Sequence, residues 1–332
     1  MINFVIHIAL FMLFSFSAFG QEDQTADLVW PSPPEQERIR YLSSISSAED
    51  VESEPGWLGK IWDLIVGAET EYRGLVQPVG VAVDEDGRVF VADPGARCVH
   101  MFDRDEEEYM SITETSTDFL RSPVCIVFAE NGTMYVSDAE QKAVFVYDEG
   151  GDPESTITGG FERPTGLCIR EDTLYVIDTG ANVVHLLNLD GSYIRRFGTR
   201  GTAAGQFNFP VFCTARENLY VVDAMNFRVQ EIDATDRTVS MFGHQGTKIG
   251  DFASPKGIAL DSDGHIYVAD AMFDAVQIFD QGANLLLVFG NSGSSHGQFL
   301  NPTGLAIDDE DRIYVVDALN KRVEVYQYVK GE

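Results

Sequence analysis

Positive charge is scarce in this sequence. Its 332 residues include 23 lysine and arginine residues against 53 aspartate and glutamate residues, so the formal net charge is −30. A surface this acidic repels the phosphate backbone of DNA or RNA, which excludes nucleic acid as a partner. The same charge keeps proteins soluble and attracts cations and basic surfaces. We therefore expect that a partner held by charge is a basic protein.

Long apolar runs are also missing after the first twenty residues. Residues 4–16 are almost wholly apolar, and Ala18 and Gly20 place small residues before a cleavage site. This run is shorter than the ~20 residues that span a bilayer. We interpret residues 1–20 as a signal peptide without a lipid-anchoring cysteine, and expect a periplasmic or extracellular protein with no transmembrane span.

The four cysteines form no CxxC or CxxCH motif, which excludes c-type haem attachment and thioredoxin-like chemistry. They are Cys98, Cys125, Cys168 and Cys213. Three of them fall in equivalent apolar strands of the repeat described below, which favours buried free thiols. Export permits disulfides, and because sequence does not give their geometry, a disulfide remains an open alternative.

Common catalytic and metal-binding motifs are absent as well. Residues 293–297 (GSSHG) have the Gly-x-Ser-x-Gly spacing, but they lie in a glycine-rich loop between two strands, whereas a nucleophile elbow joins a strand to a helix. Residues 84–87 and 261–264 have the Asp-x-Asp-Gly form of a calcium loop, but Gly95 and Met272 stand where an EF-hand has its glutamate. We predict no catalytic residue, no metal ligand and no cofactor.

Internal periodicity is the strongest feature that is present. Six segments share a proline, an apolar strand, a polar turn, a second strand ending in aspartate, and a third strand, at steps of 41 to 47 residues. The prolines are Pro78, Pro123, Pro164, Pro210, Pro255 and Pro302, and the aspartates are Asp93, Asp138, Asp178, Asp223, Asp270 and Asp317. Fourth strands are predicted at 193–197, 238–242 and 285–289. Four short strands in every ~45 residues predict β-propeller blades.

The repeat resembles the NHL repeat. AMNFRV at 224–229 and ALNKRV at 318–323 match the entry to its third strand, and the resemblance covers residues 78–328. It is weakest in the first two repeats, whose glycine-rich loops are eroded. Residues 29–45 are similar to the start of bacterial exported NHL proteins. The resemblance implies an all-β, six-bladed β-propeller of four-stranded antiparallel blades.

Ring closure follows from the end of the chain. The sixth repeat stops after its third strand, near Gln327, which would leave an open sheet edge. Residues 38–45 resemble the fourth strand at 193–197, so we expect them to close the sixth blade. The predicted layout is a lead segment at 21–37 and a propeller at 38–328. The propeller contains the repeats at 78–328 and a short helical insertion at 55–67, which is either a lid or a docking helix.

The aspartates that end the second strands have two explanations. They could form a functional ring of carboxylates. However, a carboxylate at the junction of strand and turn commonly accepts hydrogen bonds from backbone N–H groups, and six equivalent copies favour that structural role. Arg228 and Arg322 follow their aspartates by five residues, and we expect them to pair with these carboxylates.

Propeller enzymes give the main functional alternative. Zinc amidating lyases and calcium-dependent lactonases resemble this architecture, but their metal ligands converge on the central channel. His100 and His185 lie on third strands, roughly 10 Å from the innermost strand. The positions two residues after each proline are Gly80, Cys125, Gly166, Phe212, Gly257 and Gly304. We therefore predict a non-catalytic exported binding or scaffold propeller, with a divergent hydrolase or lyase holding a channel metal as the alternative.

One loop face is predicted to bind the partner. Turns between second and third strands share a face with the loops that join blades. In repeats 4 to 6 these turns carry apolar residues, where repeats 1 to 3 have PGAR, AEQK and TGAN. The predicted binding residues are Met225, Phe227, Met272, Phe273 and Leu319, with Trp57 and Trp62 of the insertion. We expect an apolar patch ringed by acid, although these residues could instead wedge between blades. The partner would be a basic or apolar-patch protein, and the resemblance suggests an exported redox system as one setting.

Overall fold

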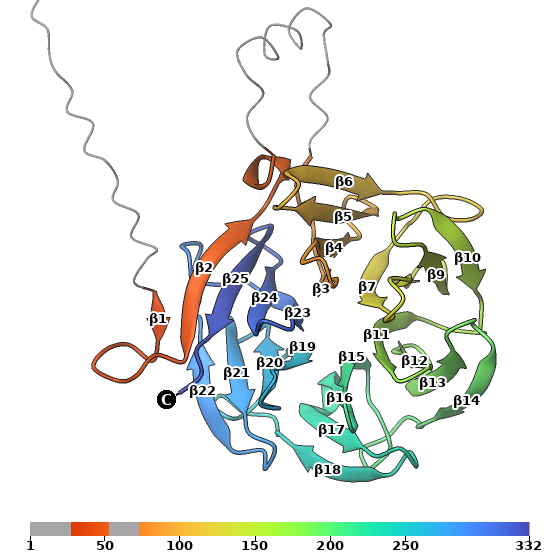
Figure 1. The fold of residues 1–332 in the computed structure, drawn as a ribbon. Helices are drawn as coiled ribbons and strands as arrows, with labels where there is room; N and C mark the ends of the chain where they lie inside the picture. Colours follow the sequence, from red (N-terminus) through yellow and green to blue (C-terminus); the bar gives the residue numbers. More distant parts are fainter. Residues whose placement is uncertain (1–27, 53–72, 332) are drawn as a thin grey trace, which may run out of the picture.

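The computed structural model describes residues 28–52 and 73–331, which form a ring of six β-sheets (Figure 1). In blades 1 to 5 the strands are antiparallel neighbours in sequence order, and the first strand of each blade packs against the first strand of the next. The predicted all-β, six-bladed propeller is therefore confirmed. No helix in the described ranges is long and apolar enough to cross a membrane.

The first strand of each blade begins at the repeat proline or shortly after it. Blade 1 contains β3 (Gly80–Val83), β4 (Val89–Asp93), β5 (Cys98–Asp103) and β6 (Glu108–Ile112). Blade 2 contains β7 (Pro123–Phe128), β8 (Met134–Asp138), β9 (Ala143–Tyr147) and β10 (Pro153–Ile157). Blade 3 contains β11 (Pro164–Arg170), β12 (Thr173–Asp178), β13 (Val183–Asn188) and β14 (Tyr193–Phe197).

The remaining blades repeat this order. Blade 4 contains β15 (Pro210–Ala215), β16 (Leu219–Asp223), β17 (Arg228–Ile232) and β18 (Thr238–Phe242). Blade 5 contains β19 (Pro255–Leu260), β20 (Ile266–Asp270), β21 (Ala275–Phe279) and β22 (Leu285–Phe289). Blade 6 contains β23 (Pro302–Ile307), β24 (Arg312–Asp317) and β25 (Arg322–Tyr328). The three predicted fourth strands coincide with β14, β18 and β22.

Blade 6 is completed by the N-terminal part of the chain. Strand β2 (Ile39–Ile45) pairs antiparallel with β25, with Ile39 opposite Tyr328 (Figure 1). The predicted closing strand is therefore confirmed. A further strand, β1 (Val29–Trp30), pairs with β2, so blade 6 has five strands and part of the lead segment belongs to the sheet. The predicted signal peptide at 1–20 and the helical insertion at 55–67 lie outside the described residues.

The inner strands of neighbouring blades approach closely because glycines face the next backbone. A Cβ on Gly257 would collide with the backbone of Thr303 and Leu305 in blade 6, and one on Gly304 would collide with Val79 in blade 1. Glycine thus allows the six strands to form a narrow ring. These inner positions serve packing between blades, which is why four of the six are glycine.

Phenylalanines from the glycine-rich loops fill the gaps between blades. Phe207, Phe252 and Phe299 are fully buried. The Phe299 ring packs on Gly290, which directly follows β22 and has a φ of 82°, so a side chain at Gly290 would meet the ring. The Phe-Gly ending of the fourth strand and the later phenylalanine therefore form one packing unit.

Candidate functional site

The aspartates at the ends of the second strands have a structural role. All six are fully buried. Asp270, for example, accepts hydrogen bonds from the backbone N–H groups of Ala253 at 2.7 Å and Ser254 at 2.9 Å in the preceding loop, and of Met272 at 3.1 Å in its own turn. Each carboxylate therefore ties a loop to a blade, as predicted.

The predicted arginine pairs are also present. The Arg228 Nε lies 2.8 Å from an Asp223 oxygen, and the Arg322 Nε lies 2.9 Å from Asp317. Each guanidinium also donates to carbonyl oxygens of the adjoining interblade loop, such as Thr202 O at 2.8 Å from Arg228. These arginines clamp the loops and are not free for a ligand.

The two histidines of the repeat are buried inside blades. His100 and His185 are both 2% exposed and lie on third strands, as predicted. Their Nε2 atoms lie 3.5 Å from Asp93 and 3.4 Å from Asp178. Neither ring nitrogen of His185 makes a well-aligned hydrogen bond. Both histidines are enclosed by the sheets and do not reach the channel.

The central channel is lined by apolar side chains of the inner strands. It holds a cavity of about 280 Å³, with lining residues that include Val81, Leu167, Phe212, Ile258 and Leu305. Within residues 28–52 and 73–331, no three or more histidine, cysteine, aspartate or glutamate side chains are grouped so that they could hold a metal ion. Such a lining offers no charged or imidazole group for catalysis.

The interpretation of the inner-strand cysteines as free thiols was wrong for two of them. Cys168 on β11 and Cys213 on β15 form a disulfide, with their Cα atoms 6.0 Å apart. Cys98 and Cys125 are free and buried, and burial raises the pKa of the Cys125 thiol to about 11. The alternation of side chains along a strand shows which face of the sheet a cysteine lies on. It could not identify the bonded pair, because the pairing also depends on the stagger between adjacent blades.

The predicted binding turns lie on what we call the upper face, formed by the turns between second and third strands and by the interblade loops. Met225, Met272 and Leu319 occupy the same turn position and are 55%, 71% and 67% exposed. Phe227 and Phe273 are only half-buried at the turn, and Phe227 packs against the main core cluster. The structure thus separates three exposed tips from two partly buried rings. Trp57 and Trp62 lie outside the described residues.

Other exposed apolar side chains share the upper face. Among the described residues, every large apolar side chain that is exposed and lies outside a strand is on this face: Val76, Phe119, Phe209, Met225, Ile249, Met272 and Leu319. Sequence reasoning missed Ile249, which is 73% exposed in the loop between blades 4 and 5. A β-branched residue between Lys248 and Gly250 in a polar loop was the available signal.

The expected ring of acid around these residues stays a prediction, because residues 53–72 beside them lie outside the described residues. In the described turns and loops between blades 3 and 6 on the upper face, the exposed Lys, Arg, Asp and Glu side chains are Arg200, Lys248 and Lys321, whereas the loop that follows blade 6 exposes Glu49 and Asp50. Asp251 is buried and Asp274 is half-buried, and the latter accepts a hydrogen bond from the Asn301 N–H at 2.8 Å. The negative charge instead gathers in turns of the opposite side, which we call the lower face.

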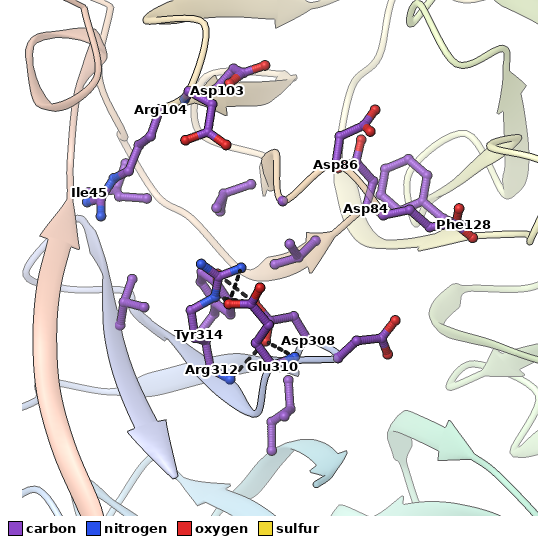
Figure 2. A pocket seen from close by; sticks show the side chains of 18 of the residues that line it. Ile45, Asp84, Asp86, Asp103, Arg104, Phe128, Asp308, Glu310, Arg312 and Tyr314 are labelled. Atoms are coloured by element: carbon purple, nitrogen blue, oxygen red, sulfur yellow. Dashed lines mark hydrogen bonds and ion pairs between the residues drawn. The ribbon is translucent and has the colours of Figure 1, made fainter. Parts of the chain in front are cut away.

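On the lower face, nine carboxylate side chains line one cavity. The cavity has a volume of about 590 Å³ and lies between blades 6, 1 and 2 beside β2 (Figure 2). Its acidic lining residues are Asp84, Glu85, Asp86, Asp103, Asp105, Glu130, Asp308, Asp309 and Glu310. Sequence reasoning singled out only 84–87, because the other residues come from separate repeats.

Three arginines bring positive charge to this cavity: Arg88 pairs with Asp84 at 2.6 Å, and Arg104 and Arg312 line the cavity. Arg312 donates to Asp308 at 2.6 Å from its Nε, and the Tyr314 hydroxyl donates to the same carboxylate at 3.0 Å (Figure 2). Arg104 donates instead to the Ser43 hydroxyl at 2.9 Å, which ties the cavity to the closing strand. The side chains of Asp86 and Glu310 are 69% and 74% exposed, so part of the negative charge faces solvent.

Comparison with known proteins gives the identity of the repeat. The model of the NHL repeat matches residues 252–274 and 299–326, which include the interblade phenylalanines and second strands of blades 5 and 6 and the arginine-bearing turn of blade 6. The chain carries NHL repeats. These form a six-bladed propeller, and the structure extends the same architecture through the four blades that precede the matched segments.

Solved structures similar to this NHL-repeat propeller have varied descriptions. One is a protein of unknown function from Bacteroides thetaiotaomicron, at 17% identity and TM-score 0.66 over 87% of this chain and 75% of that chain. Another is an auxiliary nutrient binding protein from the same organism, at 14% identity and TM-score 0.64 over 89% and 78%. A third is virginiamycin B lyase from Staphylococcus aureus, at 12% identity and TM-score 0.57 over 76% and 95%. At these identities the likeness is one of fold.

Proposed function

We propose that this NHL-repeat propeller is a non-catalytic binding protein that docks a partner protein on the upper face of blades 4 to 6. The supporting observation is the placement of its exposed apolar side chains. Met225, Met272 and Leu319 stand at one turn position in three consecutive blades, with Ile249 in the loop between two of them. Apolar side chains gathered on one face mark interaction sites in soluble proteins.

The same turn position in the other blades supports this assignment. Blades 1, 2 and 3 have Gly95, Glu140 and Gly180 there. A Cβ on Gly95 or Gly180 would press on the preceding loop, so these turns have no room for a large side chain. The protruding apolar tips are therefore a property of blades 4 to 6 and are not required by the fold of the repeat.

The likeness in fold to an auxiliary nutrient binding protein agrees with a binding role. The likeness to virginiamycin B lyase allows an enzyme in principle, but the channel lining described above has none of the ligands that a divergent metal-dependent lyase would use. A basic partner has a separate candidate surface, since the acidic cavity on the lower face could accept lysine or arginine side chains.

We further propose that the protein works outside the cytoplasm. The apolar segment at 4–16 and the small residues before position 21 support export, and the disulfide between Cys168 and Cys213 fits an oxidising compartment. N-terminal sequencing of the protein recovered from the periplasm or medium tests this proposal. A mature chain that begins near Gln21 supports it, and an intact Met1 in the cytoplasm contradicts it.

The docking proposal is tested with a triple variant, Met225→Ser, Met272→Ser and Leu319→Ser. Partners retained from an extract by the wild-type protein are purified, and their affinities for both proteins are measured. Loss of three buried apolar contacts predicts binding weaker by roughly a hundredfold or more, with melting nearly unchanged because the residues are exposed.

The matched control removes apolar surface elsewhere. Tyr193, Val239 and Leu286 are 55%, 52% and 50% exposed on the outer strands of blades 3, 4 and 5. Their replacement by serine should leave partner affinity within about twofold of the wild type. Equal loss of binding in both triple variants would show that the upper face is not the docking site.

A further inference from the structure

One buried position of the repeat differs in blade 6. It is the third residue of each third strand, seven residues after the aspartate that ends the second strand. The six residues are His100, Phe145, His185, Gln230, Gln277 and Glu324, and all are 3% exposed or less. Blade 6 alone places an acidic side chain there, next to a second buried carboxylate, Asp317.

Blade 4 shows what the position does when its side chain is neutral. The Gln230 Nε2 donates to Asp223 at 3.0 Å and to the Gln206 carbonyl at 2.7 Å, and its Oε1 accepts from the Gly205 N–H at 3.0 Å. The amide therefore supplies both a donor and an acceptor. An ionised glutamate in its place can only accept.

Glu324 has a different charge balance around it. Asp317 at the end of β24 forms an ion pair with the Nε of Arg322 at 2.9 Å. A terminal nitrogen of the same arginine lies 2.9 Å from Glu324. Two fully buried carboxylates thus share one guanidinium. If both carboxylates were ionised, the site would hold an uncompensated buried negative charge, which is costly in the protein interior.

The remaining neighbours of Glu324 come from three elements. The Tyr326 hydroxyl on β25 forms a short hydrogen bond with it, and the Gly297 N–H in the interblade loop donates at 3.1 Å. His296 in that loop has its Nδ1 4.0 Å from the carboxylate. The same Nδ1 lies 2.7 Å from the Tyr41 hydroxyl of β2, and the rings of Tyr41 and Tyr326 pack edge to face.

This cluster lies directly beneath the seam where the N-terminal strands close the ring. Trp30 of β1 packs its ring 5.8 Å from that of Tyr326, and Tyr41 of β2 joins the hydrogen-bonded group. Any change in the bond between Tyr326 and Glu324 therefore acts on residues that hold β1 and β2 to blade 6.

We propose that Glu324 is a proton-controlled latch of the ring closure: a protonated carboxyl holds β2 against β25, and loss of the proton loosens this seam. With its proton, Glu324 is neutral, as Gln230 is in blade 4, so that only Asp317 is ionised against Arg322, and its second oxygen still accepts a hydrogen bond. Without it, the site holds two carboxylates against Arg322, and hydration of the ionised group favours opening of the seam.

The direction of the pH dependence follows from burial. Burial raises the pKa of Glu324 to about 7 and outweighs the hydrogen bond from Tyr326 and the charge of Arg322, while Asp317 adds to the rise. A carboxyl with a raised pKa stabilises the closed form fully below its unfolded value, and that contribution is lost as the pH rises through about 7. The shift corresponds to on the order of 10²-fold in the seam-opening equilibrium.

Amide hydrogen exchange of β2 in the full mature chain tests the latch. At each pH the exchange rate of an unstructured peptide is divided by the measured rate of residues 39–45, which gives a protection factor. We expect wild-type protection of β2 to fall by tenfold or more between about pH 5 and about pH 8. Glu324→Gln, which installs the residue found in blades 4 and 5, should abolish this fall.

The control is Glu106→Gln, which removes an equal charge from an exposed turn of blade 1. It should keep the wild-type pH profile. Parallel profiles for wild type and Glu324→Gln would overturn the latch. Should that variant not fold, infrared titration of the wild type decides: a protonated buried carboxyl band that disappears near neutral pH supports the proposal, and its absence at pH 5 overturns it.

Discussion

Cys168 and Cys213 form a disulfide across the boundary between blades 3 and 4. Both residues lie on inner strands, so the bond joins two blades at the channel, where the ring is narrowest. The bridge closes a loop with a sequence separation of 45. It therefore restricts the unfolded chain over a full repeat as well as joining the native blades.

Replacing both bridging cysteines should lower stability without changing the fold. Cys168→Ala with Cys213→Ala is expected to cost about 3–4 kcal/mol, since the lost bridge no longer limits the unfolded chain. Urea unfolding measures the change. Reductant should destabilise the wild type by a similar amount and leave the double variant unaffected. Finding four free thiols in the unfolded, non-reduced wild type would contradict the disulfide.

The closing strand gives a second prediction. The side chain of Ile39, the first residue of β2, is fully buried, whereas that of Leu42 on the same strand is 43% exposed. Ile39→Ala should cost about 2–4 kcal/mol because it removes packed apolar volume at the seam. Leu42→Ala should stay within about 0.5 kcal/mol. Equal melting temperatures for the two variants would show that β2 does not hold the ring closed.

Much of this architecture could be read from the sequence because its signals are local and repeated. The proline, the aspartate that ends the second strand and the Phe-Gly ending lie within one repeat, and their backbone contacts are made within that repeat or with the next loop. The closing strand at 38–45 was predictable for another reason. An exposed strand edge at Tyr328 requires a partner, and few segments outside the repeats have strand character.

Features that depend on the stagger between blades could not be predicted. The choice of Cys213, and not Cys125, as the partner of Cys168 is set by the offset of three inner strands. The acidic cavity is built from turns of blades 1, 2 and 6 with the closing strand, so its residues are distant in sequence. Likewise, the total charge of the chain does not reveal that the lower face carries most of the exposed acid.

Asp178 gives a prediction for acidic pH. Burial alone would raise its pKa, but the nearby His185 and the backbone N–H groups of Ala181, Glu162 and Arg163 together lower the pKa to about 2. Its contribution to stability is therefore fully present above the unfolded value near 3.8 and is lost as the pH falls through about 2.

Asp178→Asn should remove this acid dependence. The variant is expected to lose about 2 kcal/mol at neutral pH, because an amide accepts the loop hydrogen bonds less well than a carboxylate. Urea unfolding at several pH values between about 2 and 6 measures both effects. Asp172→Asn, an exposed neighbour in the same blade, is the control. Should Asp178→Asn keep the wild-type slope of stability against pH, another carboxyl is responsible.

The two faces of the propeller predict opposite responses to salt. A partner on the upper face would contact Met225, Met272 and Leu319, which have few charged side chains beside them. Its association rate should therefore change less than about threefold between low and high salt. A basic partner at the lower cavity would be drawn in by long-range attraction, and its rate should fall steeply as salt increases. We expect the weak dependence, together with full binding by Asp86→Asn combined with Glu310→Gln. Stopped-flow association at several ionic strengths measures both, and a steep decline that this double variant removes would place the partner on the lower face.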